Sequence, residues 1–122
     1  MIAKRFRLTE SQLGKVLKNK KPFFSNLLIA NAARNGLEVS RFALILSGKV
    51  AKTSVDRNFY RRKFYDRVAH YLKTLNESNT SNITGTDTSF VVQKGNICNR
   101  RDAMMIAKFE IEVDMLLRKI HD

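Results

Sequence analysis

Apolar residues recur at helical spacing in three stretches of the chain, and each stretch predicts a helix. The first is expected to begin at Thr9, where Thr9 and Gln12 form a capping-box pattern, and to end before Pro22. The second is expected from Val55 to Leu75, and the third begins at Asn99 or Asp102. Their apolar faces are Leu13, Val16 and Leu17 in the first, Tyr60, Phe64, Val68, Tyr71 and Leu75 in the second, and Met105, Phe109, Val113, Leu116, Leu117 and Ile120 in the third.

The segments between these helices predict strands. Residues 23–33 read as one strand with Leu27 and Ile29 on one face, and residues 39–46 read as a second. The Asn35-Gly36 turn signal between them favours an antiparallel hairpin. A short strand is expected over residues 88–93, after a polar run at 76–87 that we expect to be a flexible loop. This order predicts an α+β sandwich with helices on one side of a small sheet.

The chain of 122 residues is long enough for one domain with one modest core, so residues 1–122 are expected to form a single domain. Its formal net charge is +12, and the excess lies in two segments. Residues 1–21 carry seven Lys and Arg against one Glu, and residues 47–75 carry eight against two Asp. Such charge favours a polyanionic partner, although charge for solubility alone is an alternative.

Few other features of the composition point to a class of protein. The lone Cys98 cannot form an internal disulfide, and no apolar run approaches the ~20 residues of a membrane span, so we expect a cytoplasmic protein without a membrane partner. One Cys and two His exclude a structural zinc site. The carboxylates of the basic half are too widely separated for a two-metal nuclease, and the sequence contains no P-loop.

The most informative stretch runs from Lys49 to Arg67, where seven of nineteen residues are Lys or Arg and four aromatic residues are interleaved with them. At helical spacing the stretch predicts a rod with a cationic side, which is a suitable surface for a phosphate backbone. Tyr60 and Phe64 are expected in the core, as is Tyr71 further along the helix, but Tyr65 is expected on the polar side beside Arg62. Lys49 and Lys52 lie in a loop before the helix, where they can grip phosphates.

Three segments in order, Arg41–Ser47, Lys49-Val-Ala-Lys52 and Val55–Arg62, resemble the signature of the bacterial ribonuclease P protein. The resemblance implies an αβββαβα-like sandwich with a left-handed β-α-β crossover, and a subunit that helps a catalytic RNA remove the 5′ leader of precursor tRNA without performing the chemistry. Two departures stand out, because Phe59 and Tyr65 occupy positions where the family commonly has Arg.

The resemblance also implies partners and sites. The partners are the catalytic RNA and precursor tRNA; magnesium is expected with the RNA and no cofactor on the protein, and we expect a monomer. The implied RNA-binding residues are Arg41, Ser47, Lys49, Lys52, Arg57, Asn58, Arg61, Arg62 and Tyr65. The leader is expected at Leu13, Lys15, Leu17 and whichever of Phe24 and Phe42 faces outward, held mainly by charge, with the Lys18–Lys21 run on one rim. A ribosomal or ribosome-assembly protein, or an enzyme in its own right, are the alternatives.

Overall fold

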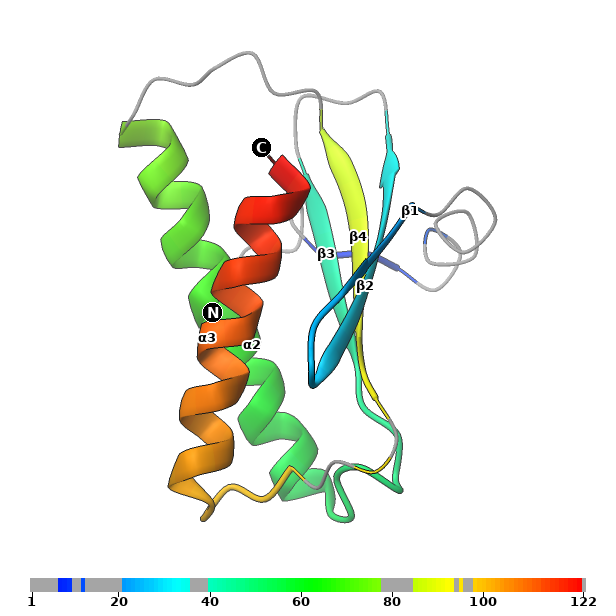
Figure 1. Cartoon of the computed structure of the whole chain (residues 1–122), viewed down its shortest axis with the longest axis vertical. Coiled ribbons are helices and arrows are strands. Elements are labelled where there is room, and N and C mark those ends of the chain that lie inside the picture. Colours follow the sequence, from blue (N-terminus) through cyan, green and yellow to red (C-terminus); the bar gives the residue numbers. More distant parts are fainter. Residues whose placement is uncertain are drawn as a thin grey trace.

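The computed structural model describes residues 7–9, 12, 21–35, 40–77, 85–93, 95 and 98–121. It has two layers, a four-stranded mixed sheet and a pair of helices that pack on one face of the sheet (Figure 1). The strands are β1 (Lys21–Phe24), β2 (Leu28–Arg34), β3 (Arg41–Ile45) and β4 (Thr86–Val92). The helices are α2 (Ser54–Glu77) and α3 (Ala103–His121). The predicted α+β class is therefore confirmed.

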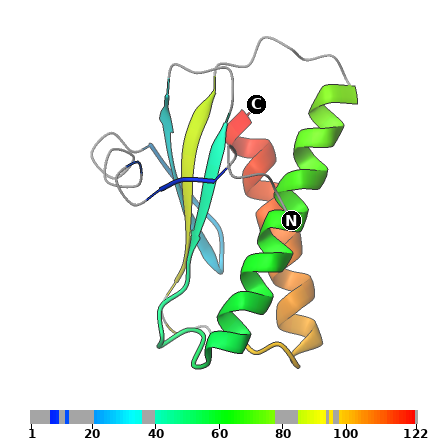
Figure 2. The ribbon, with the colours of Figure 1, turned by 180° about the vertical axis from the view of Figure 1, so that it is seen from behind.

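The sheet order is β1-β2-β4-β3, so β4 lies between β2 and β3. It pairs antiparallel with β2 and parallel with β3. The unit β3-α2-β4 is thus a β-α-β crossover between neighbouring parallel strands. In Figure 1 both strands run downward, α2 runs upward on their left, and β3 lies behind β4; Figure 2 shows the same unit from behind. This path is left-handed, an exception to the usual handedness.

The predicted hairpin between residues 23–33 and 39–46 is wrong. Residues 23–33 form two strands, because Ser25 and Asn26 make a turn in which the Leu28 amide donates to Ser25 Oγ at 3.1 Å. The next strand in the chain, β3, does not pair with β2, because β4 matches both strands along their length. Turn signals report local geometry, whereas this pairing is set by residues more than 40 positions away in the sequence.

The face predicted for the strand at residues 23–33, with Leu27 and Ile29 together, is also wrong. Leu28 and Ala30 are fully buried against the helices, whereas Ile29 is only half-buried and lies on the opposite face. Leu27 is buried too, but it lies in the turn before the strand. Because side chains alternate along a strand, an error of one residue in phase moves every side chain to the other face.

The apolar faces predicted for the second and third helices supply much of the core. Tyr60, Phe64 and Val68 of α2 are fully buried, and the two rings contact the last helix and the sheet. The Tyr60 hydroxyl donates to the Asn99 carbonyl at 3.0 Å, which satisfies its one buried polar group. From α3, the fully buried residues are Phe109, Val113, Leu116 and Leu117. Each such side chain contributes roughly 1.5–3 kcal/mol of burial free energy.

Helix ends and loops settle several smaller predictions. The Thr9 amide donates to Gln12 Oε1 at 2.8 Å, so the capping box is formed, while the rest of that helix lies outside the described residues. Asp102 caps α3, since the Met105 amide donates to Asp102 Oδ1 at 3.1 Å. The predicted flexible loop at 76–87 is too long at both ends, because α2 reaches Glu77 and β4 begins at Thr86. Residues 78–84 lie outside the described part.

Candidate nucleic-acid interface

The loop before α2 is fixed from the inside. The amides of Val50 and Ala51 donate to the Ser47 carbonyl at 3.1 and 3.0 Å, and both side chains are buried. The Cys98 amide donates to the Val50 carbonyl at 2.8 Å, which ties the loop to the segment before α3. Lys49 and Lys52 are exposed on this anchored loop. The predicted pair of loop cations is therefore held at a defined place beside the start of α2.

Thr53 caps the first turn of α2. The Asp56 amide donates to Thr53 Oγ1 at 3.1 Å, and the Thr53 hydroxyl donates to Asp56 Oδ2 at 2.9 Å. Asp56 also accepts from the amide and the guanidinium of Arg100, at 3.1 and 3.2 Å. These hydrogen bonds hold the pKa of Asp56 below its usual value, the bond from the Arg100 amide most of all. The acidic group in the first turn of α2 is thus neutralised within the protein.

The exposed side of α2 carries the predicted signature residues. Asn58, Arg61 and Arg62 are exposed, and Arg57 is half-buried, with Nη1 donating to the Ala51 carbonyl at 2.9 Å. Arg57 therefore joins the helix to the loop. Asp66 lies four residues after Arg62 on the helix, but the two form no ion pair in the described part of the chain, so the charge of Arg62 is not compensated by a carboxylate there. We call the following set the α2 basic surface: Lys49, Lys52, Arg57, Asn58, Arg61 and Arg62.

Phe59 and Tyr65, the two departures from the family signature noted above, are both partly buried. Phe59 packs edge-on against Tyr60, and Lys63 Nζ lies 5.5 Å from the centre of the Phe59 ring. The ring thus steadies a neighbouring cation instead of supplying a charge of its own. Tyr65 was predicted on the polar side of α2, but it is half-buried and packs edge-on against Phe64 at 5.1 Å.

The surroundings of Tyr65 also include the N-terminal segment. Burial raises the pKa of the Tyr65 phenol, and the neighbouring charges of Arg7 and Arg61 offset this in part. Arg7 reaches this place because its backbone bridges to Phe42 of β3, and the Leu8 amide donates to the Phe42 carbonyl at 2.9 Å. Arg7 is therefore a further cation at the edge of the α2 basic surface, and it was absent from the predicted site residues.

Arg41 is not part of this surface. Its Nε and Nη2 donate to the two carboxylate oxygens of Asp87 at 2.8 and 2.6 Å, and Asn35 Nδ2 donates to the same carboxylate at 2.8 Å. The guanidinium joins β3 to β4, and its charge is compensated. Ser47 is exposed just beyond the end of β3, where its carbonyl accepts the loop amides described above. The sequence could not show which arginine meets a distant carboxylate.

The face of the sheet turned away from α2 and α3 carries an apolar row. The strand register places one residue from each strand in line, namely Phe24, Ile29, Val91 and Ile45. Phe24 is 60% exposed and Ile45 is 36% exposed, whereas Phe42 is fully buried against the helices. Phe24 is thus the outward-facing residue of the predicted pair, and Phe42 as a leader contact is wrong. Leu13, Lys15 and Leu17 lie outside the described residues.

A sequence model of the family described as Ribonuclease P matches residues 3–120. The chain belongs to this family. It is therefore an RNA-binding protein subunit of ribonuclease P, which acts in removal of the 5′ leader of precursor tRNA. Nothing in the fold or in the comparisons favours the ribosomal alternative. No curated protein matched the sequence in a search.

Solved structures of ribonuclease P proteins share the fold. The Staphylococcus aureus RNase P protein is 13% identical with a TM-score of 0.67, and the match covers 96% of this chain and 98% of that one. A mutant of that protein with defective mRNA degradation activity gives a TM-score of 0.70 at 13% identity, covering 96% of this chain and 89% of the other. At this identity the match supports the fold, including the crossover that positions α2.

Two further observations bear on the site. Within the described ranges, no group of three His, Cys, Asp or Glu side chains could hold a metal ion. The described helices also include none that is long and apolar enough to span a membrane.

Proposed function

We propose that this ribonuclease P protein binds the catalytic RNA through the α2 basic surface and contributes no catalytic group of its own. The observation that carries the proposal is the contrast between its arginines. Arg41, Arg67 and Arg100 are each paired with an aspartate, whereas Arg61 and Arg62 are exposed on α2 and form none of the ion pairs of the described part. Exposed cations on a rigid helix are suited to phosphates, because each contact releases counterions.

The carboxylates of the described part support a role without chemistry. Asp56 and Asp87 are buried and accept hydrogen bonds from arginines, and Asp114 is paired with Arg67 at 2.6 Å. A two-metal nuclease would need such groups together and free to bind metal. We therefore assign the cleavage step to the RNA and expect magnesium to bind with the RNA. Positive charge from the protein should lower the magnesium concentration that the RNA requires.

For the leader of precursor tRNA, the open face of the sheet is the best-supported place. The sequence predicted that the leader is held mainly by charge, but the apolar row adds an exposed ring and neighbouring aliphatic side chains. An unpaired base stacked on an aromatic ring contributes ~1–3 kcal/mol. Lys21 is exposed on the same edge strand. We infer that two contributions hold the leader. One is a salt-sensitive contribution from charged side chains, and the other is a salt-resistant contribution from stacking on Phe24.

The identity of the bound RNA tests the proposal. The tagged protein is purified from its own cell without nuclease treatment, and the RNA that remains bound is sequenced. A matched preparation of a variant with Lys49, Lys52, Arg61 and Arg62 changed to Ala serves as control. We expect one large RNA that cleaves precursor tRNA at high magnesium and is lost from the variant. Enrichment of ribosomal RNA, or no difference between the two preparations, would contradict it.

A further inference from the structure

A second apolar stripe runs along α3 on the side turned away from the core. Its members are Met104, Ala107, Ile111 and Met115, spaced three and four residues apart. Met104 is 85% exposed and Ile111 is 66% exposed. Single exposed apolar residues are common, but a continuous row of them on a helix that already buries its other side marks an interaction surface. The stripe belongs to neither the α2 basic surface nor the apolar row of the sheet.

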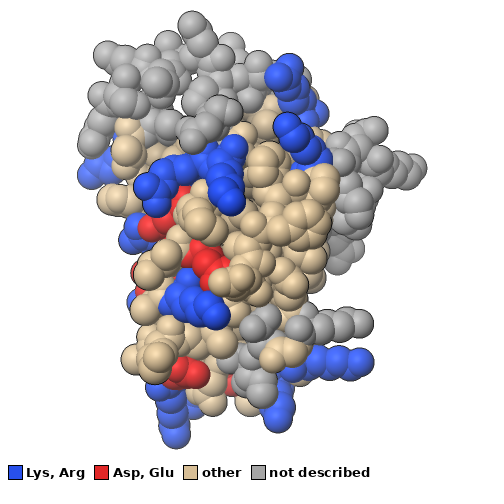
Figure 3. All heavy atoms as spheres, in the orientation of Figure 1, with Lys and Arg blue, Asp and Glu red and all other residues tan. Residues whose placement is uncertain are grey.

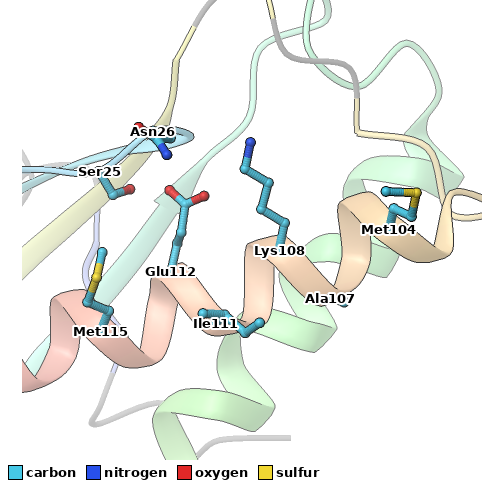
Figure 4. Close-up of a pocket in the computed structure, with 8 residues that line it drawn as sticks. All are labelled: Ser25, Asn26, Met104, Ala107, Lys108, Ile111, Glu112 and Met115. Atoms are coloured by element: carbon cyan, nitrogen blue, oxygen red, sulfur yellow. The ribbon is translucent and has the colours of Figure 1, made fainter.

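The stripe borders a hollow between α3 and the turn that joins β1 to β2. The hollow has a volume of about 600 Å³, and Ser25, Asn26, Lys108 and Glu112 complete its lining. Figure 4 shows Glu112 reaching from α3 toward Ser25 and Asn26, with Lys108 beside it. In the space-filling view from the same side as Figure 1, acidic groups lie among the basic ones and uncharged surface separates them (Figure 3).

Glu112 is incompletely satisfied. Its Oε1 accepts the Leu27 amide at 2.7 Å, which fixes the turn to α3, but its Oε2 is buried without a hydrogen-bond partner. The residue is only 6% exposed. A buried carboxylate oxygen without a donor is costly, so an approaching cation or N–H group would be favoured here. Lys108, one turn earlier on the same helix, forms no ion pair with it in the described part of the chain.

We propose that the stripe binds a second copy of this chain, with the two α3 helices antiparallel about a two-fold axis near Phe109 and Glu110. The argument is self-complementarity, which a two-fold contact requires. In this arrangement Met104 of one copy lies opposite Met115 of the other, and Ala107 lies opposite Ile111, a small side chain against a large one. Lys108 lies opposite Glu112, so that each copy offers a cation to the other's carboxylate.

Charge explains why this occupant fits better than RNA. Glu110, Glu112 and Asp114 lie along or beside the stripe and would repel phosphates. Two copies at +12 each also repel at long range, but salt screens that repulsion over a Debye length of about 8 Å at physiological ionic strength. Association should therefore strengthen as salt rises, opposite to the salt response of an RNA contact. This proposal replaces the monomer expected from the sequence.

Sedimentation and light scattering of the RNA-free protein test the stripe. We expect a dimer whose population rises with protein concentration and with salt. Ile111→Arg should raise the dimer dissociation constant more than about tenfold, because it places an unpaired charge in the contact. Val55→Arg is the matched control, since Val55 is an apolar residue 55% exposed on α2, and it should dimerise like the wild type. A protein that stays monomeric at every concentration and salt, or equal dimerisation of the Ile111→Arg variant, would overturn the proposal.

Cysteine pairs test the antiparallel geometry. Met104→Cys and Met115→Cys variants, mixed and oxidised, should form a mixed disulfide, whereas Met104→Cys alone should not. Positions 104 and 115 are about 16 Å apart along one helix, so cysteines placed at position 104 of both copies would lie beyond disulfide reach in an antiparallel pair. Native Cys98 should not interfere, because it is buried and burial raises its pKa to about 11. Cross-linking of Met104→Cys with itself, at or above the yield of the mixture, would contradict the arrangement.

Discussion

Each of three aspartates in this protein fixes one arginine, and so determines which guanidinium groups remain for RNA. Asp87 holds Arg41 between two strands, Asp114 holds Arg67 between the two helices, and Asp56 holds Arg100 at the start of α2. The sequence shows all of these residues but not their pairing, since the partners lie 44 to 47 positions apart. The arginines left exposed on α2 are those that the family signature predicted.

Two arginines on the same helix should therefore respond differently to truncation. Arg62→Ala should leave the melting temperature unchanged and reduce the salt slope of RNA binding by about 1, the loss expected for one phosphate contact. Arg67→Ala should lower stability by about 1 kcal/mol, because it breaks the two hydrogen bonds to Asp114, and it should change the slope little. Thermal melting and filter binding at several salt concentrations measure both. A lowered melting temperature for Arg62→Ala with an unchanged slope would show that Arg62 is structural.

The hydrogen bonds to Asp56 predict a pH dependence of stability. The pKa of Asp56 is lowered in the folded state, so its charge stabilises the fold above the pKa of the unfolded chain, and this contribution is lost as the pH falls through the folded value. Asp56→Asn should therefore be less stable than the wild type at about pH 7, and the difference should vanish well below an ordinary aspartate pKa of about 3.9. Urea unfolding at both ends of this range measures it. An equal difference at both would contradict the role of the charge.

At the scale of elements, the helices could be predicted and the sheet order could not. The period of Tyr60, Phe64 and Val68 is local, and one strong apolar face was enough to place α2 within two residues at each end. The position of β4 between β2 and β3 depends on pairing across the crossover, for which the sequence offers no local signal. For the same reason the sequence could not show which residues of each strand face the helices, and so it could not decide whether Phe24 or Phe42 faces outward.

The two phenylalanines give an element-scale prediction for the sheet. Phe24→Ala should leave the fold stable, because the ring is 60% exposed, and should remove a salt-resistant ~1–3 kcal/mol from leader binding. Phe42→Ala should instead destabilise the protein by roughly 3–5 kcal/mol, since the ring is fully buried. The measurement is affinity for precursor tRNA with long and short leaders at low and high salt. If the two affinities converge at high salt for the wild type, the leader is held by charge alone.

At the scale of the whole molecule, the fold separates its surfaces. The helix pair buries the core against one face of the sheet, so that the other face, the exposed side of α2 and the outer side of α3 are available for different partners. The left-handed crossover carries α2 from the end of β3 back to β4 and holds its basic end beside the loop of Lys49 and Lys52. The charge of +12 acts over this whole body and draws a polyanion toward it.

The most direct test of this account is cleavage of precursor tRNA by protein alone, by the partner RNA alone and by both together, at a magnesium concentration too low for the RNA alone. We predict no cleavage by the nuclease-treated protein and restored cleavage by the mixture, because in our proposal the protein supplies charge and binding but no catalytic group. The variant lacking Lys49, Lys52, Arg61 and Arg62 should restore little at low magnesium and regain activity as magnesium rises. Cleavage by the protein alone that survives nuclease treatment would contradict the account.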